Sequence, residues 1–208
     1  MFALELAKRG FNLVLISWNT QRLQDTDAKI KSQFSQCKTK IIQADLGECA
    51  SPDFIDLLEK QTKDLDISIL INNAGVMYNE NFINLDPLDI VGLINLNCLA
   101  PELLTQVFTN WLISHSERTG KRSAIINVDS VAGSGPAPFT AVYSGAKGFL
   151  WNLTLAISEE LKDHIDVISL APGPVNTAMS GFLKDASKFD PMTCTTETTV
   201  RGWLRDLG

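Results

Sequence analysis

The stretch DISILINNAG (residues 66–75) is a run of apolar, β-branched residues that ends in two asparagines, an alanine and a glycine. A run that is apolar on both faces is typical of a buried strand in a parallel sheet. The small and polar residues that follow favour a loop whose backbone can approach a ligand closely. We therefore predict a buried strand over residues 66–72 with a ligand-facing loop after it.

Runs of the same kind recur along the chain, and helical patterns lie between them. The other runs that we interpret as strands are 11–17, 40–44, 123–129 and 165–171. Helical patterns occupy roughly 19–36, 52–63, 87–114 and 139–162. This alternation predicts an α/β fold with a doubly wound parallel sheet. Because no repeat, low-complexity segment or linker interrupts it, we predict one domain over residues 1–208.

Composition and charge argue against several classes of function. The 208 residues carry a formal net charge of −6, whereas a nucleic-acid partner requires a basic face. No apolar run approaches the ~20 residues of a membrane span, so we predict none. The four cysteines and two histidines are scattered, and we predict no metal site. Reduced, buried thiols are typical of a cytoplasmic protein, which is the localisation we predict.

Small, polar or flexible residues follow every predicted strand. In a doubly wound sheet, ligands bind beyond the carboxyl ends of the strands. One such turn carries little information, but five at successive strand ends predict a ligand site along this edge of the sheet. The segments are SWN (17–19), ADLGE (44–48), NNAG (72–75), DSVAG (129–133) and APGPVNT (171–177).

The spacing of Tyr143 and Lys147 indicates acid–base chemistry. In a helix, residues four apart lie on one face about one turn apart. A cation beside a phenol favours the phenolate, so we expect Lys147 to lower the pKa of Tyr143 toward the range useful for proton transfer. Taken alone, such a pair is more often two polar residues on a surface helix.

These segments together resemble the short-chain dehydrogenase/reductase family over nearly the whole chain. The segment ELAKRGFNLVLIS is most similar to the branch of hydroxysteroid dehydrogenases and very-long-chain 3-oxoacyl-CoA reductases. The resemblance implies a Rossmann-like fold. It rests on Asn72-Asn73-Ala74-Gly75, Asn97 in NLNCLAPELLTQ, Ser130 thirteen residues before Tyr143, Lys147 four residues after it, and Pro172-Gly173 followed by Val175 and Thr177.

The resemblance implies hydride transfer between a nicotinamide cofactor and a ketone or aldehyde, or the reverse reaction of an alcohol. It assigns Tyr143 as the proton donor, with Lys147 lowering its pKa and binding the nicotinamide ribose. Ser130 would hold the same substrate oxygen, and Asn97 would hold a water that resupplies the proton. Read singly, Ser130 could instead be a turn cap and Asn97 a helix-interior amide bonded to nearby backbone.

The resemblance also implies which residues bind the cofactor, and some of these have structural alternatives. Asn72 does partly structural work in the family by bonding a neighbouring strand, and Asp45 could be a plain loop acid. No acidic residue follows the strand 11–17, which favours NADP, although NAD stays possible. The implied cofactor residues are Ser17, Asp45, Leu46, Asn72, Ala74, Gly75, Tyr143, Lys147, Pro172, Gly173, Val175 and Thr177.

Compared with the family, the chain starts and stops within its usual elements. MFALELAKRG resembles the first helix itself, so we expect these 208 residues to lack the first strand of the family and its glycine-rich phosphate-binding loop. The segment 191–208 resembles the last helix, without the final strand. Because a central strand contributes roughly as much free energy as a whole domain retains, we expect weak cofactor binding from the 208 residues alone.

Two classes of function remain open. The first is an NAD(P)-dependent oxidoreductase acting on an apolar small molecule such as a steroid or an acyl chain. The second is a catalytically weakened interaction protein with the same fold. A serine hydrolase is disfavoured, because Ser130 lacks the glycine two residues before it that a nucleophile elbow has. We expect a substrate lid over 178–195, which could also be an amphipathic helix, and homo-oligomers paired through helices 87–114 and 139–162.

Overall fold

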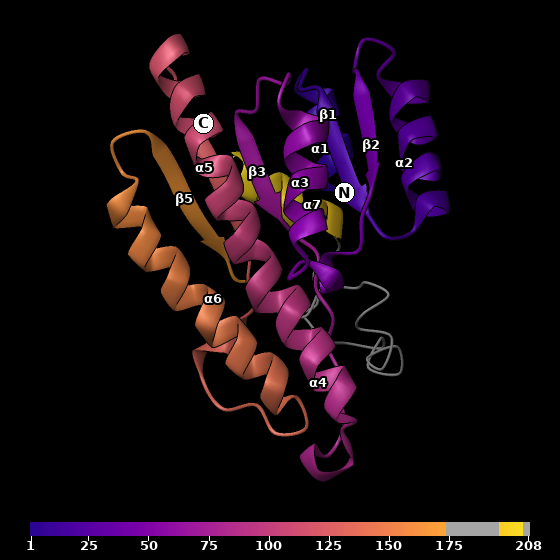
Figure 1. Cartoon of the computed structure of the whole chain (residues 1–208), viewed down its shortest axis with the longest axis vertical. Coiled ribbons are helices and arrows are strands. Elements are labelled where there is room, and N and C mark those ends of the chain that lie inside the picture. Colours follow the sequence, from indigo (N-terminus) through magenta and orange to yellow (C-terminus); the bar gives the residue numbers. More distant parts are fainter. Residues whose placement is uncertain (174–195, 206–208) are drawn as a thin grey trace. The chain divides into compact units, whose positions relative to one another are not determined.

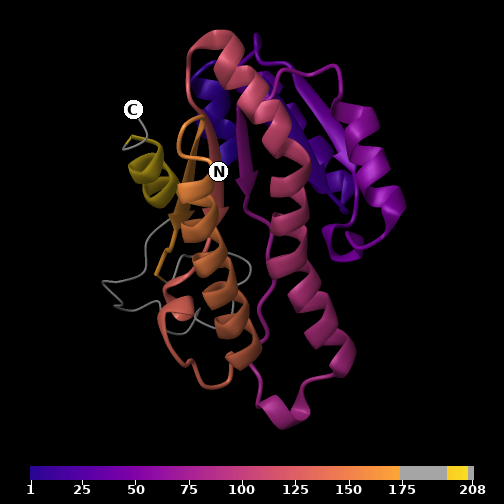
Figure 2. The same cartoon turned by 60° about the vertical axis from the view of Figure 1, so that its left-hand side comes forward.

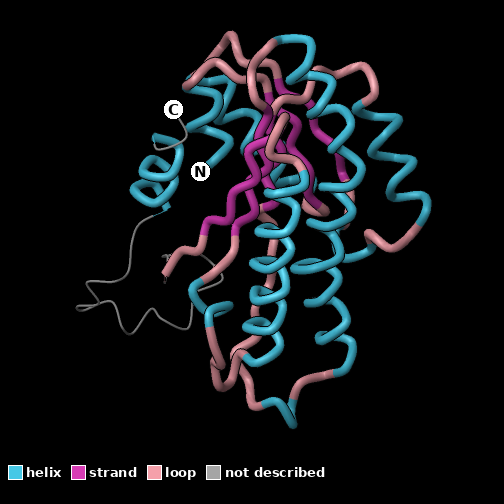
Figure 3. The backbone as a smooth tube through the Cα atoms, turned by 90° about the vertical axis from the view of Figure 1, so that its left-hand side faces the viewer, coloured by secondary structure: helices cyan, strands magenta, loops and turns pink. Residues whose placement is uncertain are grey.

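The computed structural model describes residues 1–173 and 196–205, and these fall into two units (Figure 1). The first unit contains residues 1–46 together with 196–205, and the second contains residues 47–173. Strands and helices alternate along the chain, as can be followed in Figure 3. All paired strands are parallel, which confirms the predicted α/β class.

The first unit is built around two parallel strands. These are β1 (Leu13–Ser17) and β2 (Thr39–Gln43), with Leu13 opposite Thr39. Apolar residues of α1 and of the segment around α2 pack together in its core, with Ile30 fully buried. The helices of this unit are α1 (Phe2–Lys8), α2 (Thr20–Gln33) and α7 (Thr196–Arg205).

The turn from α1 to β1 depends on a glycine. Gly10 has a φ of +88°, in the left-handed region where a side chain is strained. The N–H groups of Gly10 and Phe11 donate to the carbonyls of Ala7 and Leu6 at 3.0 and 3.1 Å. The last carbonyls of α1 therefore keep partners where the helix ends.

A buried carboxylate connects α1 to α7. Glu5 is only 5% exposed, and it accepts hydrogen bonds from Arg201 Nε and Arg9 Nη1, each at 2.9 Å. The Arg201 guanidinium, and after it Arg9, holds the pKa of Glu5 below its usual range, although burial opposes this. Charge-assisted hydrogen bonds thus compensate the buried charge.

The second unit contains a three-stranded parallel sheet in the order β3-β4-β5. Its strands are β3 (Ile69–Asn72), β4 (Ser123–Val128) and β5 (Ile165–Leu170). The register places Asn72 opposite Asn127, and Asn127 opposite Ser169. Within residues 1–173 and 196–205, β1 pairs only with β2 and β3 pairs only with β4.

Helices connect the strands of the second unit. Among them, α6 packs on β5 and runs alongside α4 (Figures 1 and 2). The α-helices are α3 (Pro52–Thr62), α4 (Pro87–Ile94), α5 (Ala100–Thr119) and α6 (Ala141–Glu160), and the short 3₁₀ turns are η1 (Leu46–Glu48), η2 (Phe82–Asn84) and η4 (Val131–Ser134).

A π-helical turn, η3 (Asn95–Leu99), interrupts the helix predicted over 87–114. Asn97 lies in this turn, and its side-chain amide donates to the Leu93 carbonyl at 3.0 Å. The same amide donates to the carbonyl of a distant loop residue, Val76, at 2.8 Å. The sequence pattern did not predict η3.

The helical path Pro87–Thr119 is long and apolar enough to cross a membrane by length and composition alone. Among the residues that the structure describes, this is the one helix that meets the test, and 39% of its most apolar window is buried in the protein. Core helices of soluble proteins meet the same test, so this is weak evidence for a span. The predicted absence of a span stays a prediction.

Candidate functional site

Tyr143 and Lys147 lie one turn apart on α6, and both are buried, with 9% and 4% of their surface exposed. The Lys147 Nζ atom is 5.7 Å from the centre of the Tyr143 ring. The same ammonium donates to the Val128 carbonyl, at the end of β4, at 2.7 Å. Their burial rules out the alternative of two polar residues on a solvent-facing surface.

Ser130 follows the end of β4 and has two roles in the local geometry. Its hydroxyl oxygen accepts from the Ala132 N–H at 3.2 Å and so caps η4. It also forms a side-chain hydrogen bond with Tyr143. The turn-cap interpretation is therefore confirmed, while the role of Ser130 in holding the substrate oxygen stays a prediction.

Gly133 in η4 brings this turn directly against α6. A β-carbon at this position would lie 2.8 Å from the Lys147 carbonyl carbon and 2.9 Å from the Gly148 nitrogen. Only a glycine permits such a close approach without moving the backbone. The contact fixes Ser130, three residues earlier, next to the helix that carries Tyr143.

The Asn97 side chain is bonded to backbone, as the helix-interior alternative stated. Its Nδ2 donates to the carbonyls of Val76 at 2.8 Å and Leu93 at 3.0 Å, and its Oδ1 accepts from the Val76 N–H at 3.3 Å. A β-carbon on Gly75 would lie 2.7 Å from Asn97 Oδ1 and 3.9 Å from Lys147 Nζ. The side chain thus lies close to Lys147, while the water relay assigned to Asn97 stays a prediction.

Asn72 belongs to a buried polar network beneath these residues. Its Nδ2 donates to Asn127 Oδ1 at 2.8 Å, and Asn127 Nδ2 donates to Thr154 Oγ1 at 2.8 Å. This confirms the expected bond from Asn72 to a neighbouring strand. The network joins β3, β4 and α6, and it was not foreseen because its members are 55 and 27 residues apart.

Asp129 is a buried carboxylate at the site that the sequence reasoning did not assign. It is 2% exposed and stands between the end of β4 and Ser130. Its Oδ1 accepts from the Ser130 N–H at 2.9 Å, and its Oδ2 accepts from the Ser169 hydroxyl at 3.2 Å. The signal was present in the segment DSVAG, where an acidic residue directly precedes Ser130.

The expected lowering of the Tyr143 pKa is wrong for the protein in this state. Burial raises the pKa of Tyr143, a side-chain hydrogen bond with Ser130 lowers it, and the charge of Asp129 raises it. The spacing of the two residues in sequence indicates only the neighbouring cation. Burial also lowers the pKa of Lys147, while the charge of Asp129 raises it. Loss of solvation is therefore the largest cause of the pKa shift at both groups.

The remaining predicted cofactor residues are spread along the chain. Ala74 and Gly75 follow β3, and Pro172 and Gly173 follow β5; the Pro172 carbonyl accepts from the Val131 N–H at 3.1 Å. In the first unit, Ser17 ends β1, and Asp45 and Leu46 follow β2. Three predictions lie outside the described residues: Val175, Thr177 and the lid over 178–195.

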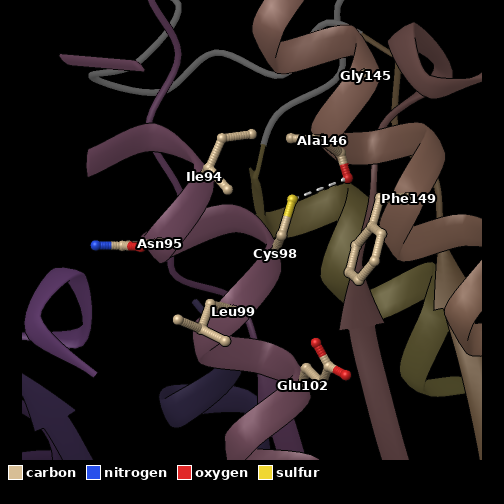
Figure 4. Close-up of a pocket in the computed structure, with 8 residues that line it drawn as sticks. All are labelled: Ile94, Asn95, Cys98, Leu99, Glu102, Gly145, Ala146 and Phe149. Atoms are coloured by element: carbon tan, nitrogen blue, oxygen red, sulfur yellow. Dashed lines mark hydrogen bonds between the residues drawn. The ribbon is translucent and has the colours of Figure 1, made fainter. Parts of the chain in front are cut away.

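An apolar pocket of about 370 Å³ lies between η3, α5 and α6 (Figure 4). Cys98 and Ala146 face one another across it, and the Cys98 thiol donates to the Ala146 carbonyl at 3.7 Å. Burial raises the pKa of Cys98 to about 11, so the thiol stays protonated. The pocket is lined by Ile94, Asn95, Cys98, Leu99, Glu102, Gly145, Ala146 and Phe149. Within residues 1–173 and 196–205, no cluster of three or more His, Cys, Asp or Glu residues could hold a metal.

Known proteins with similar sequences identify the family. The profile of short chain dehydrogenases matches residues 1–188. Very-long-chain 3-oxoacyl-CoA reductases from Coccidioides immitis and Anas platyrhynchos are 30% and 33% identical to the chain and cover all of it. The chain spans 57% and 64% of these two relatives' own lengths.

A solved structure with the same fold supports the assignment. It is a short-chain dehydrogenase from Sphingobium yanoikuyae in complex with NADPH, which is 26% identical. The superposition covers 99% of this chain and 78% of that one, with a TM-score of 0.81. The chain therefore belongs to the short-chain dehydrogenase family.

Proposed function

We propose that the chain carries the catalytic residues of an NADPH-dependent reductase that converts a ketone into a secondary alcohol. One observation supports this above all others: the Tyr143 phenol is hydrogen-bonded to Ser130 and lies above the buried ammonium of Lys147. Two hydroxyl groups that converge beside a cation can bind and protonate one carbonyl oxygen.

The donor set at Lys147 fits a nicotinamide ribose. An ammonium has three N–H donors, and Lys147 donates one of them to Val128. The other donors suit the ribose hydroxyls. The preference for NADPH over NADH is supported by β1, which ends in Ser17 and is followed by Trp18 and Asn19 without a carboxylate. NADPH is also the cofactor in the Sphingobium yanoikuyae structure.

The bound cofactor would supply the hydride, and the chain's residues would handle the proton. The raised pKa of Tyr143 keeps the phenol protonated at neutral pH, which suits a proton donor. Ser130 would donate to the same substrate oxygen and orient it. Proton transfer from a positioned group typically contributes ~10²–10⁴ in rate.

For the substrate, we propose a 3-oxoacyl thioester with a long apolar chain. The support is the names of the relatives from Coccidioides immitis and Anas platyrhynchos, which are very-long-chain 3-oxoacyl-CoA reductases. The 3-keto group of such a substrate is the carbonyl that Tyr143 and Ser130 would bind. A steroid ketone is the second substrate class to test.

We also propose that the protein forms homo-oligomers in the cytoplasm. Both α4 and α6 expose large apolar side chains, a feature that often marks an interface between proteins. Analytical ultracentrifugation tests the oligomeric state directly, and a monomer at micromolar concentration would refute the proposed homo-oligomer. The exposed residues are Leu88, Val91 and Ile94 on the α4 side and Phe149, Trp151 and Leu155 on α6.

The test is replacement of each of the two tyrosines in the chain. Tyr143→Phe keeps the ring but removes the proton, so kcat for NADPH-dependent ketone reduction should fall by at least about a hundredfold. Tyr78→Phe is the matched control and should keep at least about a third of wild-type turnover, because nothing assigns Tyr78 to the reaction. NADPH consumption is followed with a saturated long-chain 3-oxoacyl-CoA and with a steroid ketone.

Two results would overturn the proposal. The first is a Tyr143→Phe variant, shown to be folded by circular dichroism, that keeps more than about a tenth of wild-type turnover. The second is a wild-type chain that shows no turnover with either substrate. That second result would favour the alternative function, an interaction protein that shares the fold.

A further inference from the structure

Three large apolar side chains stand exposed at one end of the second unit, and we call them the apolar tip. They are Phe82 and Ile83 in η2, at 62% and 83% exposure, and Phe139 in the loop before α6, at 61%. Figures 2 and 3 show η2 and this loop at the same end of the unit. Because side chains of this kind are usually buried, a group of them left in water often marks a binding surface.

Phe139 is also held in a strained backbone conformation. Its φ is +65°, in the left-handed region, and among the residues that the structure describes it is the one non-glycine residue with a positive φ. A bulky side chain at such a φ costs free energy that a glycine or an asparagine would largely avoid. Backbone strain of this kind is concentrated at functional sites. Phe139 therefore destabilises the free protein in two ways, through its exposed apolar surface and through its backbone.

The apolar tip is joined to the candidate site. The Glu80 N–H donates to the Phe139 carbonyl at 2.8 Å, which ties the loop before α6 to the segment that leads into η2. Just before Glu80, residues 76–78 pack against the apolar cluster that contains Tyr143. Phe139 is four residues from Tyr143, so their Cα atoms lie at most about 14 Å apart. The tip is therefore within reach of a long substrate whose carbonyl is bound at Tyr143.

The two segments that form the tip supply no cation. No lysine or arginine occurs between residues 64 and 117 or between residues 123 and 146. The carboxylates nearest to η2 in sequence already have partners, since Glu80 accepts from the Asn81 N–H at 2.7 Å and Asp86 caps α4. An anionic head group would find no charged partner on these segments, whereas an uncharged alkyl chain needs none.

We propose that the apolar tip binds the hydrocarbon tail of the 3-oxoacyl thioester and so makes the protein selective for long tails. The inference rests on the proposed function, because it starts from a 3-keto group bound by Tyr143 and Ser130. From there the tail extends away from the reacting carbonyl toward the tip. Contact with Phe82, Ile83 and Phe139 then removes apolar surface on both partners from water.

The expected selectivity follows from the burial of methylene groups. Each methylene group that leaves water raises affinity by up to roughly fourfold. In the wild-type protein, kcat/KM should therefore be at least about tenfold higher for 3-oxopalmitoyl-CoA than for acetoacetyl-CoA. Equal values for the two substrates would overturn the proposal.

Replacing tip side chains by serine should reduce this selectivity. In the double variant Phe82→Ser/Ile83→Ser, the ratio of the two kcat/KM values should fall by about tenfold. Leu65→Ser is the matched control, because Leu65 is an exposed leucine that precedes β3, at the end of that strand away from the site. It should leave the ratio unchanged. A ratio that stayed constant in the double variant, or that fell equally in the control, would refute the role of the tip.

Phe139→Asn separates binding from stability. Asparagine adopts a positive φ more readily than phenylalanine does, so the Tm of this variant should equal or exceed that of the wild type. The ratio of kcat/KM values should nevertheless fall several-fold, because the apolar contact is lost. A variant that melted at a lower temperature and kept the wild-type ratio would show that Phe139 serves the fold, which would contradict the proposal.

Calorimetric titration with palmitoyl-CoA, which has no 3-keto group, tests the tip without turnover. Used below its critical micelle concentration, it should bind the wild-type protein more tightly than free CoA does. The double variant Phe82→Ser/Ile83→Ser should bind palmitoyl-CoA about tenfold more weakly and free CoA as the wild type does. Because this measurement needs no chemistry, a failure of the inference is distinguishable from a failure of the proposed function.

Bilayer lipids are the other source of alkyl chains, and flotation with phosphatidylcholine vesicles tests them. The wild-type protein should not float with such vesicles if the tip is built for the substrate's tail. Flotation that the double variant loses, together with equal affinities of the wild type for palmitoyl-CoA and free CoA, would overturn the proposal in favour of a membrane-binding tip.

Discussion

Replacing Gly133 with alanine would test whether the close contact between η4 and α6 positions Ser130. The added β-carbon would lie 2.8 Å from the Lys147 carbonyl carbon, 2.9 Å from the Gly148 nitrogen and 3.0 Å from the Lys147 oxygen. All three are backbone atoms within a helix, so no side-chain rotation relieves the contact. We therefore expect η4 to move away from α6.

The size of the effect follows from the overlap. Forcing extra atoms into a packed region typically costs about 1–3 kcal/mol of stability. In a protein of this size, each kcal/mol lowers the Tm by roughly 2–4 °C. A shift of Ser130 by about an ångström would cost on the order of a hundredfold in ketone turnover. We expect both losses in Gly133→Ala.

Gly135→Ala is the matched control, because it lies in the same loop. A β-carbon at Gly135 meets nothing within 4 Å, and its φ of −177° is open to any residue. Urea unfolding and thermal melts of the two variants give the comparison. If their free energies of unfolding agreed within about 0.5 kcal/mol, the inferred role of Gly133 would be wrong.

Two further predictions concern single side chains. Glu5→Gln should lower the free energy of unfolding by roughly 1.5–3 kcal/mol at neutral pH. The folded-state pKa of Glu5 is lowered, so the Glu5 carboxylate stabilises the fold above the unfolded-state pKa of about 4.3. This stabilisation is lost as the pH falls through the folded-state pKa. Urea unfolding of wild type and variant should thus converge in acid, and a constant difference would contradict the reasoning. Gly75→Ala should destabilise the fold by about 1–2 kcal/mol, because the added β-carbon would press on Asn97, whose side chain is held by three hydrogen bonds. Gly92→Ala is the control and should not destabilise the fold, because a β-carbon there meets nothing within 4 Å. Equal melting temperatures for the two variants would count against this prediction.

Much of the fold could be predicted because it depends on local patterns. The apolar runs that predict strands all form strands, and the helical patterns between them form helices. The residues on α6 were paired correctly because the helix period alone brings Tyr143 and Lys147 to one face. Ser130 and Asn97 required the family resemblance, since nothing in their own neighbourhood distinguishes them from capping or structural residues.

What could not be predicted depends on contacts between distant segments. The start of β3 at Ile69 rather than residue 66 is one example, because the pattern does not show where the ladder to Ala124 begins. The network from Asn72 through Asn127 to Thr154 is another. Each of these residues is an ordinary polar residue in sequence, and only the parallel register places the three side chains within hydrogen-bonding distance.

The pKa of Tyr143 shows why residue spacing cannot set the direction of an electrostatic effect. Spacing identifies the nearest cation, but the shift is a balance that includes burial and every other charge nearby. Here burial acts against ionisation of both Tyr143 and Lys147, and the carboxylate of Asp129, which is distant from Tyr143 in sequence, adds to the effect at the phenol. For a group that must give up a proton rather than take one, this direction is useful, because a phenol that stays neutral is ready to donate. The pKa of Tyr143 is therefore governed by loss of solvation first and then by Ser130 and Asp129, and the spacing to Lys147 alone does not give its direction.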